Sequence, residues 1–307
     1  MTHATRQTLI KKNLHLRADI LSATRRFFNQ AGYLEVETPY RIPAPAPEVH
    51  IDAEPSGDWF LHTSPELCMK QMLAAGFSRM YQICKCFRQK ERGSKHLPEM
   101  TMLEWYEAES DYADMMKMCE DLICFIAGAI GRGDFIFYQG RRIALAKPWD
   151  RITVRRAFEK YAGISMEAAI QKQSFDEIMA CDIEPHLGAE KPVFLYDYPS
   201  VFGSLAQNKP EDALLAERFE LYIGSIELCN AFSELTNPLE QRQRFEHEIQ
   251  ERRALGKQEY PMPEKFLSAL QHMPDAAGNA LGIDRLSMLF ADTTRIDDVV
   301  AFTPEEL

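Results

Sequence analysis

Long apolar runs are missing from this 307-residue sequence, in which no stretch approaches about 18 consecutive apolar residues, the length that a membrane-spanning helix needs. No apolar segment followed by a small-residue cleavage site occurs near Met1. We therefore expect neither membrane insertion nor secretion, and we predict a cytoplasmic protein.

Paired cysteines are missing as well. The seven cysteines are odd in number and include no Cys-x-x-Cys spacing, which argues against a disulfide framework and a zinc motif. Cys84 and Cys86 are expected to point to opposite faces of a strand, and so not to share a metal. All seven are interpreted as small buried side chains in a reducing compartment.

Positive charge is scarce, because 35 Lys and Arg residues against 46 Asp and Glu residues give a formal net charge of −11. Nucleic-acid affinity depends on cations that neutralise phosphates, so this balance disfavours a tRNA-binding protein. Arg252, Arg253 and Lys257 are candidates for a local basic patch, but a solvated helix face is the favoured interpretation of these residues. The 46% hydrophobic content still allows a substantial core, and the length suits one large domain over residues 1–307.

The most informative stretch covers residues 80–106. Alternating side chains predict two antiparallel strands, one at each end, joined by a basic, glycine-containing hairpin loop that ends at Pro98. Because successive side chains of a strand point to opposite faces, Glu104 and Tyr106 share a face of the second strand. Arg88, at the end of the first strand, completes a face that presents a guanidinium, a carboxylate and a phenol.

Hydrophobic spacing predicts the remaining elements of an α+β fold. We expect amphipathic helices over residues 13–31, 114–130, 152–161 and 167–179, and strands over residues 33–39 and 193–199. Ser64 or Thr63 could cap a further helix that carries Glu66 in its first turn, a role that needs no ligand.

A second hairpin, over residues 218–235, carries acidic side chains. A Gly-Ser turn at 224–225, of the type with glycine first, pairs Glu220 with Cys229 and places Glu227 diagonally on the same face as Glu220. Two carboxylates so placed can hold magnesium beside a phosphate, and exposed strand glutamates are the alternative interpretation.

Glu234 lies an odd number of residues after Glu227, so uninterrupted alternation would turn it to the opposite face. A bulge near Asn230 and Ala231 would return it to the face of the two metal-binding candidates. We therefore predict that Glu234 joins the same pocket only through such a bulge.

Three segments in order resemble the motifs of class II aminoacyl-tRNA synthetases of the lysine type. The helix, Gly, strand and Pro of about 13–39 resemble motif 1, and His-x-Pro-Glu-x-Thr-Met-Leu-Glu-Trp-Tyr within about 80–107 resembles motif 2. Gly-x-x-x-Gly-x-Asp-Arg within about 278–290 resembles motif 3. The chain is most similar to the truncated lysyl-tRNA synthetase paralogues that attach β-lysine to elongation factor P.

This resemblance covers nearly the whole chain and implies a class II synthetase-like antiparallel β-sheet flanked by helices. It also implies a homodimer built on motif 1, although a helix packed on its own sheet would explain that periodicity equally well. No anticodon-binding domain is expected before motif 1 or after motif 3, and no stable tRNA binding.

The implied activity is ATP-dependent, Mg²⁺-assisted activation of (R)-β-lysine or lysine as an adenylate, followed by transfer to a lysine of elongation factor P. A stand-alone lysyl-tRNA synthetase core and a non-catalytic amino-acid sensor are the alternatives. The complete set of phosphate and metal residues argues against the sensor.

The resemblance further implies roles for individual residues. Arg88, His96 and Arg285 would be catalytic, and Glu220 and Glu227 would bind the metal. The ATP site would comprise Arg88, Gln89, Glu91, His96, Met100, Glu227, Leu228, Gly282 and Arg285. The amino-acid pocket would comprise Ser64, Glu66, Glu104, Tyr106, Asn230, Phe232, Glu234 and Ala280.

The sequence departs from the lysine-type pattern at several of these places. Lys90 replaces a glutamate that Glu91 could supply one position later, and Leu97 replaces an asparagine. Met100 replaces the phenylalanine that stacks on adenine, which predicts weaker nucleotide binding. Ala280 occupies a position that is glycine in lysyl-tRNA synthetases and alanine in the elongation factor P ligases. The resemblance therefore favours a substrate whose amino group is displaced by one carbon, as in β-lysine.

Overall fold

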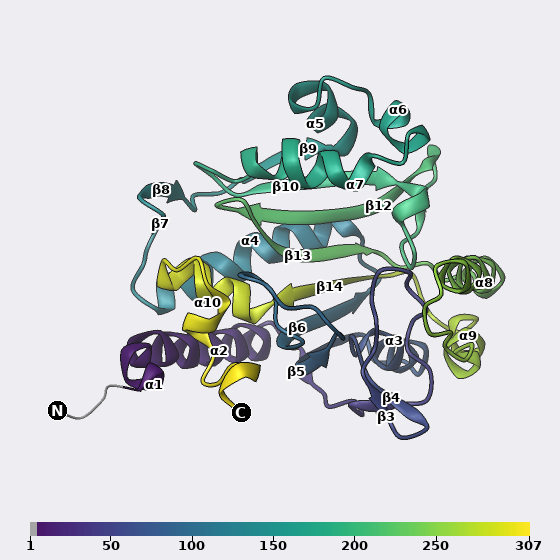
Figure 1. Cartoon of the computed structure of the whole chain (residues 1–307), viewed down its shortest axis with the longest axis horizontal. Coiled ribbons are helices and arrows are strands. Elements are labelled where there is room, and N and C mark those ends of the chain that lie inside the picture. Colours follow the sequence, from purple (N-terminus) through teal and green to yellow (C-terminus); the bar gives the residue numbers. More distant parts are fainter. Residues whose placement is uncertain (1–4) are drawn as a thin grey trace.

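The chain forms one large sheet, two small sheets and helices on both sides of the large sheet (Figure 1). The computed structural model describes residues 5–307. The large sheet contains β1 (Leu34–Glu35), β5 (Arg79–Phe87), β6 (Glu99–Ala108), β9 (Asp150–Thr153), β10 (Val193–Pro199), β11 (Asn208–Lys209), β12 (Asp212–Ile223), β13 (Ile226–Ser233) and β14 (Ala276–Gly282). The small sheets contain β2 (Arg41–Ile42), β3 (Pro55–Ser56) and β4 (Trp59–Leu61), and β7 (Phe135–Tyr138) and β8 (Arg141–Ala144).

The helices are α1 (Arg6–Leu9), α2 (Lys11–Gln30), α3 (Glu66–Ala74), α4 (Tyr112–Ala129), α5 (Val154–Tyr161), α6 (Met166–Gln171), α7 (Phe175–Ile178), α8 (Pro238–Ala254), α9 (Glu264–Leu270) and α10 (Ile283–Ala291). A π-helical turn follows α7 (Met179–Ile183). Short 3₁₀ turns lie at Glu184–His186, Ser200–Phe202, Ile296–Val299 and Pro304–Glu306.

The strand order of the large sheet is β1-β5-β6-β14-β13-β12-β10-β9, with β11 paired to β12. The six central strands pair antiparallel, whereas β1 and β9 at the edges run parallel to their neighbours. This arrangement confirms the α+β class with a largely antiparallel sheet flanked by helices. It also places the three sequence motifs side by side, since β1 of motif 1 pairs with β5 of motif 2, and β14 of motif 3 pairs with β6 of motif 2.

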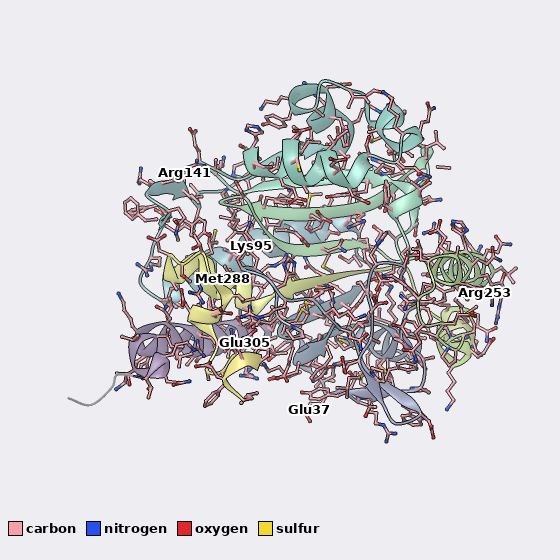
Figure 2. All side chains as sticks on the ribbon, in the orientation of Figure 1. Glu37, Lys95, Arg141, Arg253, Met288 and Glu305 are labelled. Atoms are coloured by element: carbon pink, nitrogen blue, oxygen red, sulfur yellow. The ribbon has the colours of Figure 1, made fainter. Side chains whose placement is uncertain are left out.

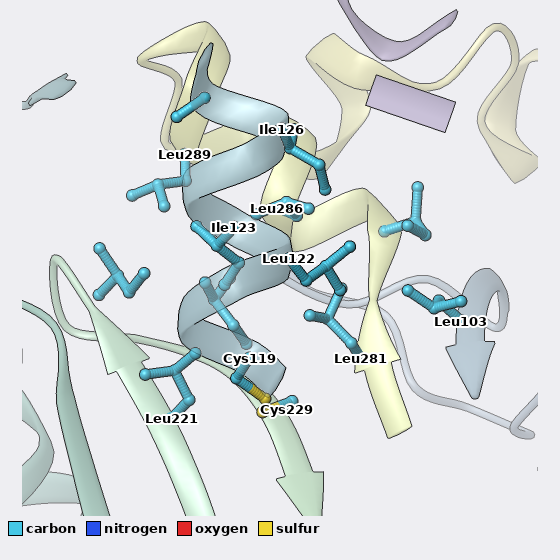
Figure 3. Close-up of a cluster of buried hydrophobic side chains, with 14 of the residues drawn as sticks. Leu103, Cys119, Leu122, Ile123, Ile126, Leu221, Cys229, Leu281, Leu286 and Leu289 are labelled. Atoms are coloured by element: carbon cyan, nitrogen blue, oxygen red, sulfur yellow. Dashed lines mark hydrogen bonds between the residues drawn. The ribbon is translucent and has the colours of Figure 1, made fainter. Parts of the chain in front are cut away.

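The main core lies between the sheet and the helices α2, α4 and α10. Helix α4 begins where the Asp111 carboxylate accepts the backbone N–H groups of Ala113 and Asp114, at 2.8 and 3.0 Å. Its buried face carries Leu122 and Ile126, spaced four residues apart, toward β14 and α10 (Figure 3). The predicted helix over 114–130 is therefore confirmed within two residues.

Most other predicted elements are confirmed, but the strand over residues 33–39 is limited to Leu34–Glu35 and the helix over residues 167–179 is divided. The helix predicted over residues 13–31 is α2, and the chain turns away from it at Gly32. Gly32 has a φ of 76°, which residues with a side chain rarely adopt. Residues 167–179 form two short helices instead of one, because Gln173 takes a φ of 55° between α6 and α7 and ends the helical path.

The second hairpin has a different turn and register from those predicted. Gly224 and Ser225 both have a φ of 60°. The turn is therefore of the type in which both central residues have a positive φ, whereas the predicted type has a positive φ only at the first, glycine, position. Glu220 pairs with Asn230 and not with Cys229. Leu228 is an extra residue without a partner in β12, so the pairing register differs by one residue before and after it. The predicted bulge is present, two residues earlier than expected.

The expectation for the cysteines is wrong in part. Cys84 and Cys86 lie on the same face of β5 with their Sγ atoms 3.9 Å apart, because residues two apart in a strand share a face. Four cysteines are buried, but Cys68 and Cys124 are partly exposed and Cys181 is exposed.

A buried ion pair joins the three motifs. Arg17 of α2 contacts the Asp284 carboxylate at the start of α10, with 2.5 Å between Nη1 and Oδ1. The other oxygen of Asp284 accepts the backbone N–H of Thr101 in β6 at 2.8 Å, and Arg17 also donates to the Thr101 hydroxyl at 2.8 Å. Motif 1, motif 2 and motif 3 thus meet at one cluster of charges.

We expect Asp284→Ala to destabilise the fold by about 3–5 kcal/mol, since removing one partner leaves the Arg17 charge buried without compensation. Urea unfolding followed by circular dichroism measures this loss. The Arg17→Met/Asp284→Ala double variant should lose less than the sum of the two single variants. The exposed Asp176→Ala is the matched control, and strictly additive losses would contradict the coupling.

Candidate active site

A cavity of about 580 Å³ opens on the sheet between β5, β6, β13, β14 and the β5–β6 loop. Lys95, on that loop, lines the cavity and donates to the Ser225 carbonyl in the β12–β13 turn at 3.2 Å (Figure 2). The predicted site residues that line the cavity are Ser64, Glu66, Arg88, Glu91, His96, Met100, Glu104, Tyr106, Glu227, Leu228, Asn230, Phe232, Ala280, Gly282 and Arg285. Residues far apart in the sequence are therefore gathered at one site.

Three predicted residues do not line the cavity. Gln89 donates its backbone N–H to the Asp52 carbonyl at 2.7 Å, beside the cavity. Glu220 and Glu234 lie behind the lining residues, and Glu234 is 1% exposed.

One end of the cavity is cationic. Arg285 donates to the Glu227 carboxylate at 3.0 Å and to His96 Nε2 at 2.5 Å. Burial and the neighbouring Arg285 charge lower the pKa of His96, so its ring is neutral at pH 7 and accepts this bond. Arg88 has a buried Nε with no hydrogen-bond partner and only a 3.9 Å ion pair with Glu91. Its guanidinium is thus available to a carboxylate or phosphate.

The acidic pair lies next to this cationic end. Burial and the Glu227 charge raise the pKa of Glu220, whose oxygens accept bonds from the hydroxyls of Tyr198 and Tyr222 at 2.6 and 2.7 Å. Burial opposes ionisation of Glu227 too, but the charge of Arg285 lowers its pKa overall. Glu227 is therefore the more acidic carboxylate of the pair.

The donor set suits magnesium, which binds to one or two carboxylates and to substrate phosphates. Glu227 faces the cavity with its charge. Glu220 accepts three hydrogen bonds, two from tyrosines and one from Arg218 at 2.6 Å, and a carboxylate has about four acceptor positions. Glu227 is thus the better direct ligand, with Glu220 behind it.

The other end of the cavity is acidic and buried. Lys70 donates to Glu66 at 2.6 Å and forms an ion pair with Glu234, whose Oε1 has no hydrogen-bond partner. Glu104 accepts bonds from the hydroxyls of Ser64 and Tyr106, at 2.6 and 2.9 Å. Two carboxylates therefore pair with Lys70, and the Glu104 carboxylate is held separately by two hydroxyl groups.

This crowding changes the acidity of the carboxylates. Burial and the Glu66 charge raise the pKa of Glu104 to about 7. Burial, which outweighs the opposing charge of Lys70, raises the pKa of Glu234 to about 8. A cationic ligand would favour the ionised forms, so this end of the cavity is suited to an ammonium group.

Gly278 is a site residue that the motif 3 pattern contains but to which no role was given. A Cβ atom there would lie 2.4 Å from Glu234 Oε1 and 2.3 Å from Cε1 of Tyr106. Only glycine lets β14 approach these two side chains so closely. The position therefore preserves the shape of the acidic end.

Sequence reasoning missed other residues of the cavity. Arg218 lines it and donates to Glu220 at 2.6 Å and to Asn230 at 3.0 Å. Lys95 and Arg92 also line it, and Arg92 is paired with Asp297 and Glu305. Lys70 lies behind the lining residues. Arg218 could have been predicted, because it lies two residues before Glu220 in the same strand and therefore shares its face.

The three cations considered for a basic patch do not form one, and the favoured interpretation, a solvated helix face, holds for the exposed Arg253 but is wrong for the buried Arg252. Arg252 is buried and paired with Asp52 at 2.8 Å, Lys257 shares that carboxylate at 3.3 Å, and Arg253 pairs with Glu259 at 2.7 Å. Since each cation has a carboxylate partner, little charge is left for phosphates.

Within residues 5–307, no helix is long and apolar enough to cross a membrane.

The fold and the cavity define a class of protein: the chain belongs to the tRNA synthetases class II (D, K and N), whose family pattern matches residues 2–306. It is 38% identical over 307 residues to the elongation factor P–(R)-β-lysine ligase of Edwardsiella ictaluri (strain 93-146), covering 95% of this chain and 94% of the relative. The ligase of the same name from Pectobacterium carotovorum subsp. carotovorum (strain PC1) is 38% identical over 311 residues, covering 95% of each chain. The lysine–tRNA ligase of Moorella thermoacetica is 36% identical over 320 residues, covering 95% of this chain and 65% of the relative.

We expect lysine to stabilise the protein more at pH 8 than at pH 6. Because the pKa values of Glu104 and Glu234 are raised, the folded protein without ligand becomes less stable as the pH rises from 6 to 8 and the two groups ionise. A cationic ligand binds to these ionised forms, so it stabilises the protein more at pH 8. Affinity should increase on the order of tenfold. Thermal unfolding with and without lysine at both pH values measures the effect.

Glu234→Gln should reduce this pH dependence, and the exposed Glu246→Gln should leave it unchanged. A lysine-induced shift that is equal at the two pH values would contradict the role of the buried carboxylates.

Proposed function

We propose that this protein activates (R)-β-lysine, or lysine, with ATP and transfers it to a lysine side chain of elongation factor P. The observation that carries the proposal is the division of one cavity into an end with the cations Arg88 and Arg285 and a buried end with carboxyl groups. The names of the most similar relatives supply the acceptor and the β-amino acid.

In the first step, a carboxylate oxygen of the amino acid attacks the α-phosphorus of ATP, and the bond to pyrophosphate breaks. Arg88, with its unpaired Nε, would hold the carboxylate against the α-phosphate. His96 and Arg285 would bind the outer phosphates, and Arg285 must exchange its bond to Glu227 for them. Magnesium, held by Glu227 and Glu220, would neutralise phosphate charge.

The acidic end would orient the amino acid. Its side-chain ammonium would approach the free Oε1 of Glu234 beneath Gly278 and Tyr106. Its other amino group would bind near Glu66, whose carboxylate lines the cavity. In the second step, the lysine amine of the acceptor attacks the activated carbonyl, AMP leaves, and the nitrogen loses a proton to give an amide.

A second candidate is the charging of tRNA with lysine, which the likeness to a lysine–tRNA ligase favours. The paired states of Arg252, Arg253 and Lys257 and the net charge of −11 argue against it. The homodimer and the organisation of residues 1–307 as one domain remain predictions.

We expect labelled lysine or (R)-β-lysine to appear on elongation factor P and not on tRNA. The measurement is an acceptor assay with ATP, in which the two acceptors are compared under the same conditions. Glu227→Gln should lower ATP–pyrophosphate exchange on the order of 100-fold while the fold is kept. Label on tRNA, with none on elongation factor P, would make the second candidate the correct one.

Ala280 is expected to set the preference between the two lysines. It lies between Asn230 and Glu104 in the paired strands and lines the cavity, so its methyl group occupies space at the amino-acid site. We expect (R)-β-lysine to have the higher kcat/KM, and Ala280→Gly to narrow the ratio on the order of tenfold. Pyrophosphate exchange with both substrates measures it, and an unchanged ratio would show that the methyl group only packs the strand.

A further inference from the structure

A cluster of three metal-ligating side chains lies behind the cavity wall and has no role in the proposed reaction. His62, Cys84 and Cys86 each offer one ligand atom, and these atoms lie within 4.8 Å of one another. All three residues are buried, with exposed fractions of 1%, 3% and 0%. The cluster joins β5 to the segment that precedes α3.

The histidine is oriented for a ligand. Its Nε2–H donates to the Lys85 carbonyl at 2.6 Å, which leaves the lone pair on Nδ1. Nδ1 is buried and has no hydrogen-bond partner. A ring whose one nitrogen donates to a backbone carbonyl while the other is free is the arrangement that metal-binding histidines adopt.

The two sulfur atoms have a suitable separation. They lie 3.9 Å apart. In a tetrahedral site with zinc–sulfur bonds of about 2.3 Å, two sulfur ligands are about 3.8 Å apart. The strand therefore holds the thiols at the required spacing before any metal binds.

We propose that His62, Cys84 and Cys86 form a binding site for a thiophilic divalent cation, for which zinc is the reference ion. Binding forms two metal–sulfur bonds and one metal–nitrogen bond, and the two thiols release their protons to solvent. Two thiolates balance the charge of a divalent ion, so the buried assembly is neutral. A fourth position stays open.

An exposed tyrosine lies on one side of the cluster, and side chains of the cavity wall lie on the other. Tyr40, which is 46% exposed, covers the histidine with 5.2 Å between the ring centroids. On the other side, Met100, Met102 and Ala280 pack against the two cysteines and line the cavity. A bound ion would thus stiffen the end of β5 from which Arg88 projects.

Cobalt(II) titration of the reduced, untagged full chain tests the proposal, because tetrahedral cobalt–thiolate sites absorb strongly in the visible and near ultraviolet. We expect absorption that saturates at one equivalent and disappears when zinc displaces cobalt. Native mass spectrometry should show one zinc per chain. No thiolate absorption in the unaltered chain would overturn the proposal, whether or not any variant folds.

Substitutions of the three proposed ligands test where the ion binds. Cys84→Ser and Cys86→Ser should abolish the absorption, and His62→Gln should weaken cobalt binding at least about tenfold. The matched control is Cys119→Ala, because Cys119 and Cys229 form another buried thiol pair, 3.8 Å apart. The exposed Cys181→Ser is the second control. Absorption that survives in Cys84→Ser and Cys86→Ser, or is lost in Cys119→Ala, would place the metal elsewhere and reject this site.

Discussion

The buried charge cluster of Asp284, Arg17 and Thr101 is the constraint on which the rest of the site depends. It fixes the first turn of α10 against β6 and α2, with contacts of 2.5 and 2.8 Å. The next residue, Arg285, is thereby directed to Glu227 and His96. Buried charges hold position because the alternative, an unpaired charge in the core, is costly.

The cavity has arginines at one end and buried carboxyl groups with raised pKa values at the other. At the cationic end, the Arg285 charge lowers the pKa of Glu227 against the effect of burial. At the acidic end, burial raises the pKa of Glu234 to about 8 even though Lys70 is in contact with it. The phosphates of ATP suit the end with the arginines, and the ammonium group of lysine suits the end with the buried carboxyl groups.

The register shift at Leu228 makes this division possible. Before it, Glu227 faces the cationic end; after it, Asn230 and Phe232 line the cavity and Glu234 lies just behind them. Without the extra residue, Glu234 would point into the opposite layer. One inserted residue in a strand thus lets one hairpin serve both ends of the cavity.

The sequence by itself determined the order of elements, the antiparallel sheet, the facing of Glu104 and Tyr106, and the need for a bulge before Glu234. These features are local, because side-chain alternation and helical spacing act over a few residues. It could not locate the bulge, since Asn230 and Cys229 are both acceptable partners for Glu220 until β14 pairs with β13. Only tertiary structure decided which side chains share a buried space.

That is why Lys70, Gly278 and the meeting of His62 with the two thiols of β5 were not foreseen. Each depends on the distance between segments that are remote in sequence, such as the 2.4 Å that a side chain at position 278 would leave to Glu234. The same holds for Arg252, which periodicity placed on a solvated helix face and which is 0% exposed against Asp52. Burial of a charge is set by its partner, and partners are chosen by the fold.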